Sequence, residues 1–137
     1  MTPAMAFFDL RQAVATLEEG SGTIEVAGQR IGCATLFETS RSQAAVFRLR
    51  AGQRIPAHTH SAIDDIFFGV RGRGRIRTWD EHGAARDQAL DPGTVVLVEP
   101  ETPHEVSCAD DEVCYVLLQA PKERYDSQHY PSPEAPS

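Results

Sequence analysis

The sequence predicts an all-β protein, a single barrel or sandwich of short antiparallel strands. From residue 23 onward, short runs rich in β-branched and aromatic residues alternate with turn residues at regular spacing. Glycine, proline and aspartate mark the turns, most clearly in Asp91-Pro92-Gly93. No stretch has the pattern of a strand–helix–strand unit and no internal repeat is visible, so one copy of the barrel is expected.

Each expected strand is a run of five to eight residues between turn residues. Two of these turns, Arg71-Gly72 and Ala109-Asp110-Asp111, each separate a pair of short strands. The expected strands cover residues 23–27, 31–38, 44–50, 55–60, 65–71, 74–79, 86–90, 94–98, 104–108 and 113–119.

Residues 1–22 are expected to form an N-terminal extension that contains a short helix. Four apolar residues recur there at spacings of three and four, which is typical of an amphipathic helix. They are Phe7, Leu10, Val14 and Leu17. Asp9 is placed to cap the start of the helix and Gly20 to end it. The apolar face is expected to pack against the barrel or a second subunit.

The barrel is expected to span residues 23–120, and residues 121–137 to form a C-terminal arm and tail. The composition of this last segment shifts toward proline, and its final residues are expected to be disordered. Tyr125 and Tyr130 are predicted to hold the first part of the arm against the barrel.

Composition and charge narrow the class of protein. The 137 residues suffice for one domain, and a formal net charge of −7 disfavours binding to nucleic acid. The odd number of cysteines, three, favours free thiols in a reducing compartment. Neither a signal peptide nor an apolar run of about 20 residues is visible. The expectation is a soluble cytoplasmic protein that does not enter a membrane.

The most informative motif is His58-Thr59-His60, followed by Asp65 and, much later, His104. On a strand, His58 and His60 point to the same face, because side chains alternate with a period of two. Three imidazoles and one carboxylate form a ligand set for a divalent transition metal such as Fe, Mn, Ni, Co or Zn. The function depends on whether these four side chains converge.

The spacing of this motif resembles the first motif of the cupin superfamily. Gly52 precedes His58 by five intervening residues, four residues separate His60 from Asp65, and six separate Asp65 from Gly72. The family pattern has Glu where this chain has Asp65. In every other position of the motif the match is complete.

A second segment resembles the other cupin motif, with Gly93 and His104 at matching positions. Glu99 and Glu101 stand where the family usually has Pro and Gly. The two motifs are separated by a short segment, as in small single-domain cupins, and the resemblance covers roughly residues 35–119.

The resemblance implies a double-stranded β-helix, a jelly-roll barrel whose interior holds one metal ion on His58, His60, Asp65 and His104. Because Asp is one methylene shorter than Glu, two arrangements remain open. Asp65 completes a four-ligand site, or it orients a ligand or a water at a three-histidine site. A bulge could also exchange Asp65 with its neighbour Asp64.

Several other residues are candidates for substrate contacts. Gly69 could leave room for a substrate near the metal, or it could be a packing accommodation or a bulge. Arg48 or Arg54 could hold a substrate carboxylate. Glu99 or Glu101 could act as a general base, although a solvated turn is the favoured interpretation of these two glutamates.

Other polar residues have simpler interpretations. The arginines of residues 71–77 could form a solvated or dimer-facing surface, or an anion clamp. Cys108 is interpreted as a small buried hydrophobic residue, His82 as a surface residue and His129 as a bystander.

The resemblance implies two function classes. The first is a metal-dependent enzyme on a small organic molecule: a dioxygenase (an oxidoreductase), a decarboxylase, a lyase or an isomerase. The second is a non-catalytic module that binds or senses a small molecule. The sequence assigns no catalytic residue outside the ligand set. A homodimer is expected, because many cupins pair through the outer sheet.

Overall fold

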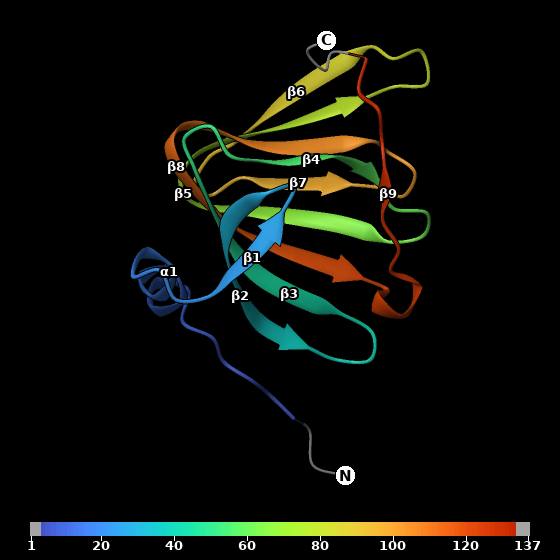
Figure 1. The fold of residues 1–137 in the computed structure, drawn as a ribbon. Helices are drawn as coiled ribbons and strands as arrows, with labels where there is room; N and C mark the ends of the chain where they lie inside the picture. The colour runs from blue at the N-terminus through green and yellow to red at the C-terminus, as the bar shows by residue number, and fades with distance from the viewer. Residues whose placement is uncertain (1–3, 134–137) are drawn as a thin grey trace.

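The computed structural model describes residues 4–133, in which antiparallel strands curl into a barrel with one N-terminal helix at its side (Figure 1). The elements, in chain order, are α1 (Leu10–Glu18), β1 (Thr23–Val26), β2 (Gln29–Glu38), β3 (Gln43–Arg50), β4 (Arg54–Thr59), β5 (Asp64–Trp79), β6 (Ala85–Leu90), β7 (Val95–Val98), β8 (His104–Ala120), η1 (Lys122–Arg124) and β9 (Gln128–His129). This arrangement confirms the predicted all-β jelly-roll fold with a short N-terminal helix.

Two long strands, β5 and β8, join the two halves of the barrel. They pair antiparallel, from Asp64 opposite Ala120 to Thr78 opposite His104. The first part of β8 also pairs with β4, and its second part pairs with β3. Strands β6 and β7 pair with the two parts of β5. The motif strands β4, β5 and β8 are therefore neighbours around one interior.

The turns predicted at Arg71-Gly72 and at residues 109–111 do not end strands. β5 and β8 continue through these positions, with register shifts between Gly69 and Arg71 and between Gly72 and Gly74. A bulge bends a strand and raises its twist without ending it. Gly72 suits this bend, since its φ is 73° and an added Cβ would lie 2.0 Å from the Glu112 carbonyl oxygen.

The interior of the barrel is a continuous hydrophobic cluster. Alternate residues of each strand point inward, as the period of two requires. The buried members are Ile31, Leu49, Phe67, Ile76, Leu90, Val98, Val106, Val113 and Tyr115. These residues fix the registers that carry the histidines and Asp65.

Helix α1 packs on the outer face of the sheet, which is one of the two positions expected from the sequence. The Asp9 carboxylate accepts a hydrogen bond from the Arg11 backbone N–H at 3.0 Å, which caps the helix. Val14 and Leu17 are buried, and Leu17 joins a second cluster with outward-facing residues such as Val46. No helix in residues 4–133 is long and apolar enough to cross a lipid bilayer.

The chain after β8 forms an arm that returns across one end of the barrel, seen in red in Figure 1. Strand β9 pairs with β4, and the Tyr130 backbone N–H donates to the Ala57 carbonyl oxygen at 3.0 Å. The Tyr130 ring lies 5.5 Å from that of Trp79. The predicted attachment of this segment is thus present, whereas the end of the predicted disordered tail, residues 134–137, lies outside the described residues.

Candidate metal centre

The four predicted ligand residues meet inside the barrel. His58 lies on β4 and His60 just after its end, while Asp65 lies near the start of β5 and His104 begins β8. His58 pairs directly with His104 across β4 and β8, which brings two imidazoles together. One potential ligand atom from each of the four residues lies within 4.8 Å of the others. The group could therefore hold a metal ion.

Backbone carbonyls orient all three imidazole rings. In each ring, Nδ1 lies at hydrogen-bond distance from a carbonyl oxygen, so Nε2 is directed at the centre of the cluster. The pairs are His58 with Pro56 (2.8 Å), His60 with Asp126 (2.5 Å) and His104 with Thr102 (2.8 Å). Hydrogen bonds of this kind fix the tautomer and the orientation of metal-binding histidines.

Asp65 reaches the centre of the cluster although it is shorter than Glu. Its Oδ2 atom lies 2.9 Å from His104 Nε2 and 3.1 Å from His60 Nε2. Its Oδ1 atom accepts a hydrogen bond from Gln119 Nε2 at 2.9 Å. Asp64 is not a member of the cluster, so the exchange of the two aspartates by a bulge does not occur.

The chemistry of this donor set fits a divalent metal. When Nδ1 donates to a carbonyl, a neutral imidazole presents a lone pair at Nε2. Two such lone pairs face the same Asp65 oxygen, and each repels the negative charge of that oxygen unless a proton or a cation lies between them. Neighbouring ligands of a metal with bonds of about 2.1 Å are separated by roughly 3 Å, which matches the distances from Asp65 to His60 and His104.

The charges of the cluster also suit a cation. Burial opposes the negative charge of Asp65, but when a proton takes the place of the cation, hydrogen bonds from the His104 and His60 rings outweigh burial and hold the pKa of Asp65 well below its usual range. Burial and the neighbouring imidazoles lower the pKa of His58 to about 4. At neutral pH the site therefore offers a carboxylate and a neutral His58, the protonation states that a metal requires.

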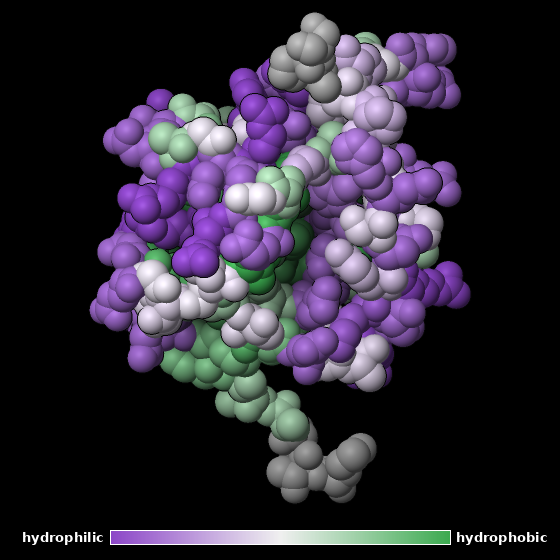
Figure 2. All heavy atoms as spheres, viewed as in Figure 1, coloured by the Kyte–Doolittle hydropathy of each residue, from purple (hydrophilic) through white to green (hydrophobic). Residues whose placement is uncertain are grey.

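A cavity of about 360 Å³ lies against the cluster, with His58, His60 and Asp65 in its wall. The rest of the wall is largely apolar and aromatic, from Ile24 and Val26 on β1 to Phe47 and Tyr115 in the interior. In Figure 2 a hydrophobic hollow opens at the centre of the face, between β1 and the C-terminal arm. A small molecule in this cavity would touch the cluster directly.

The C-terminal arm completes the site. The Asp126 carboxylate accepts hydrogen bonds from the backbone N–H of Ser61, at 2.8 Å, and from the Ser61 hydroxyl. The Tyr125 ring lies 5.4 Å from the His60 ring. His129 pairs with His58 and lines the cavity, so its interpretation as a bystander was wrong.

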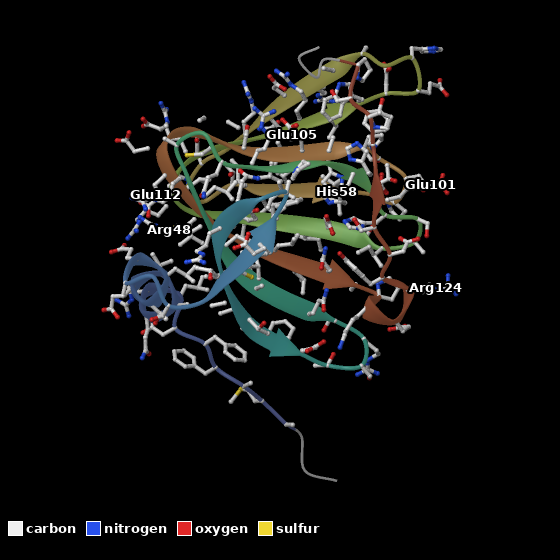
Figure 3. The ribbon with its side chains drawn as sticks, in the orientation of Figure 1. Arg48, His58, Glu101, Glu105, Glu112 and Arg124 are labelled. Atoms are coloured by element: carbon white, nitrogen blue, oxygen red, sulfur yellow. The ribbon has the colours of Figure 1, made fainter. Side chains whose placement is uncertain are left out.

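Asp126→Ala removes the carboxylate that binds Ser61, so it is expected to loosen the arm. The looser arm no longer holds the Asp126 carbonyl against His60, and metal binding should weaken by about 10- to 100-fold. Trypsin cleavage after the exposed Arg124 (Figure 3) should become faster. Metal affinity and the rate of cleavage are the measurements, with the adjacent Glu123→Ala as control. Unchanged values for Asp126→Ala would show that the arm does not support the site.

The other candidates for substrate contacts do not reach the cavity. Arg48 pairs with Glu112 at 2.5 Å, on the side of the barrel away from His58 (Figure 3). Arg54 is half exposed and lies 3.7 Å from Glu105. Neither arginine lines the cavity, so the hypothesis that they hold a substrate carboxylate was wrong.

Glu99 and Glu101 are exposed and do not line the cavity, so neither is placed to act as a general base. Glu101 has a φ of 66°, which explains why the cupin pattern usually has Gly at this position. Its backbone N–H donates to the His60 carbonyl oxygen at 2.7 Å. The residue therefore forms the turn between β7 and β8 and ties it to the end of β4, while its side chain points outward (Figure 3).

Gly69 does not make room for a substrate. An added Cβ would lie 1.9 Å from the Asp91 carbonyl oxygen, where the turn before β7 crosses β5. The Gly69 N–H also donates to Thr94 O at 2.9 Å. Gly69 therefore lets two backbone segments pass close to each other beside a bulge. This agrees with the packing interpretation of Gly69 and not with the interpretation as substrate space.

The arginines of residues 71–77 form a surface and not an anion clamp. Arg71 pairs with Glu112, Arg73 with Asp91, and Arg75 and Arg77 with Asp87. None of them lines the cavity beside the cluster.

The remaining polar residues agree with the sequence. The His82 side chain is 82% exposed. Cys108 is half-buried against the interior cluster, and Cys33, Cys108 and Cys114 are all free thiols. None of the three belongs to the metal-capable group.

A family model described as a cupin domain matches residues 45–119, which is more than half of the chain. A search of curated proteins finds no match. Among solved structures, a double-stranded β-helix domain protein from Klebsiella pneumoniae has a TM-score of 0.68 at 16% identity. That match covers 93% of this chain and 100% of the other.

Two enzymes have the same fold at low sequence identity. DMSP lyase DddQ from Ruegeria pomeroyi has a TM-score of 0.64 at 21% identity, over 82% of this chain and 58% of its own. Oxalate decarboxylase OxdC from Bacillus subtilis, a protein with Mn(II) centres, has a TM-score of 0.64 at 16% identity, over 81% of this chain and 30% of its own. The family match, the barrel and the cluster at both motif positions lead to one conclusion: the chain belongs to the cupin family.

Proposed function

We propose that this protein is a metal-dependent enzyme that acts on a small organic molecule. One divalent transition metal, Fe, Mn, Ni, Co or Zn, would bind to His58, His60, Asp65 and His104. The observation that carries the proposal is the orientation of three Nε2 atoms and one carboxylate oxygen toward a common point. Each of these four side chains is held in place by a hydrogen bond at its other polar atom. Such preorganisation is typical of a metal site and unnecessary for a hydrophobic core.

When bound, the metal would act as a Lewis acid and would keep about two coordination positions for a substrate. The residues of the chain then have separable tasks. The carbonyls of Pro56, Thr102 and Asp126 hold the ligand rings, and Gln119 holds Asp65. The apolar wall keeps water away from the reacting centre and strengthens its electrostatic interactions.

Among the described residues that line the cavity outside the cluster, three have side chains that can exchange a proton: Tyr115, Tyr125 and His129. Burial raises the pKa of Tyr115 and of Tyr125, so both phenols are protonated at neutral pH. They can donate a hydrogen bond to a substrate but are poor bases. A reaction that needs a base would therefore draw on His129 or on a group of the substrate itself.

The lyase and the decarboxylase among the structural neighbours support an enzyme over a sensor, and leave the reaction type open. The metal decides between reaction classes, since Fe(II) suits dioxygenation whereas Zn, Ni or Mn suits lyase, decarboxylase or isomerase chemistry.

The test is turnover by the metal-loaded protein. Protein loaded with each of the five metals is incubated with a panel of small oxygenated molecules, and product formation is followed by mass spectrometry and oxygen uptake. Metal-free protein and His104→Ala serve as controls. We expect turnover that requires the metal and His104. A molecule that binds tightly and is recovered unchanged would instead favour a sensor.

We also propose that the protein is a homodimer. The outer faces of β5 and β7 present a row of apolar side chains: Ile66, Phe68, Val95 and Leu97. Val95 and Leu97 are 61% and 55% exposed, and Phe7 before α1 is 88% exposed. An apolar surface of this kind on a sheet is typical of a protein interface.

Light scattering at micromolar concentration is expected to give twice the 15.0 kDa mass of one chain. Leu97→Glu should shift the mass toward that of the monomer, because it places a charge in the apolar interface. Gln88→Glu, on the exposed β6, is the matched control. A strictly monomeric wild-type protein would refute the dimer.

A further inference from the structure

We propose that the substrate has a hydrophobic body of about the size of one ring and a single metal-binding head group with at most one negative charge. This inference rests on the proposed function and specifies its substrate class. It follows from the shape, composition and charge of the cavity beside the metal centre.

Aromatic side chains form one wall of the cavity. The Phe47 and Tyr115 rings are stacked, with centroids 5.3 Å apart and an interplanar angle of 11°. The Phe67 ring lies 5.7 Å from Tyr115, and its edge faces His104 at 6.2 Å. Flat aromatic surfaces next to the ligand rings favour a flat, apolar molecule.

Aliphatic side chains form another part of the wall. Ile24 and Val26 come from β1, and Ile55 comes from β4. With a volume of about 360 Å³, the cavity is near the lower end of the range for ligand pockets, roughly 300–1,000 Å³. It has room for a ring with small substituents.

The charge of the cavity limits the charge of the substrate. None of the described residues that line it is Lys or Arg. Arg48 and Arg54, the nearest candidates in the sequence, face Glu112 and Glu105 instead. A divalent metal and the Asp65 carboxylate leave a net charge of about +1, which compensates one negative charge on the head group. A second negative charge would meet neither Lys nor Arg in this wall and would lie mostly against apolar side chains.

Three hydroxamic acids test this inference with one constant head group. Acetohydroxamate has a methyl body, benzohydroxamate a phenyl body, and 4-carboxybenzohydroxamate a phenyl body with a second charge. Each is titrated into the Co(II)-loaded protein, and binding is read from the visible absorption of the cobalt, which requires no turnover. Benzohydroxamate should bind about tenfold or more tightly than acetohydroxamate, because burial of the ring is favourable. The added carboxylate should remove most of this gain.

A pair of variants locates the effect. Val26→Ser makes the aliphatic wall polar and should reduce the preference for benzohydroxamate. Leu97→Ser makes the same kind of change on the outer face and should leave the preference intact.

The outcomes separate this inference from the proposed function. If cobalt does not bind, the metal centre is wrong and the substrate class is overturned with it. If cobalt binds but none of the three compounds changes its spectrum, the metal centre stands and the proposed substrate class is wrong. If all three compounds bind equally, or the carboxylated one binds best, the metal centre stands and the proposed substrate class is wrong.

Discussion

His104→Ala is expected to weaken binding of a divalent metal by more than about 100-fold, beyond the effect of losing a supporting hydrogen bond. His104 is 1% exposed, and its Nε2 lies 2.9 Å from Asp65 Oδ2. Its loss removes one ligand and leaves Asp65 with fewer partners in a buried site. Competition with a chromophoric chelator measures the affinity.

Two further variants make this result specific. His82→Ala removes an imidazole that is 82% exposed and should leave the affinity unchanged. His104→Asn keeps a polar side chain at the site and, if it is folded by circular dichroism, separates loss of the ligand from loss of the fold. Wild-type affinity in a folded His104 variant would contradict the proposed ligand set.

Gly69→Ala is expected to destabilise the protein by about 3 kcal/mol, at the upper end of the cost of overpacking. The new Cβ would lie 1.9 Å from a backbone oxygen, that of Asp91, which cannot turn aside as a side chain can. The Gly69 N–H and carbonyl also hold the turn, through hydrogen bonds with Thr94 O and Gly93 N at 2.9 and 3.0 Å. A shift that relieved the contact would strain both of these bonds.

Gly93→Ala is the matched control, because it changes the same turn at a position with no atom within 4 Å. Its φ of 86° should cost only about 1–2 kcal/mol. Urea unfolding of both variants gives the comparison. Equal stability of the two variants would show that the turn and β5 can move apart to accommodate the added methyl group at residue 69.

The strands and the convergence of the four candidate ligands could be predicted because their signals are local. Alternation placed His58 and His60 on one face, and the two motifs placed Asp65 and His104 at the right distances along the chain. The observed strand limits differ from the predicted ones mainly at Gly72 and at residues 109–111. The residue types at these positions are typical of a turn and also of a bulge within a continuous strand. Only the pairing with neighbouring strands of the barrel decides which of the two forms.

The part of the site contributed by the arm could not be predicted. The contact between Asp126 and His60 joins residues 66 positions apart, and neither spacing nor composition marks a backbone carbonyl as a partner. The sequence left Gly69 open between two interpretations for a similar reason, since the turn that crosses it belongs to a later segment. Tyr125 and Tyr130 were the one local hint that the arm returns to the barrel.

Elemental analysis of tag-free protein, purified without chelators, tests the central claim most directly. The proposed site predicts about one equivalent of Fe, Mn, Ni, Co or Zn per chain, and its loss in His104→Ala. A metal content near zero, persisting after anaerobic reconstitution with each of the five metals, would contradict the proposal. His58, His60, Asp65 and His104 would then form a hydrogen-bonded polar cluster, and a metal-free binding function would replace the enzyme.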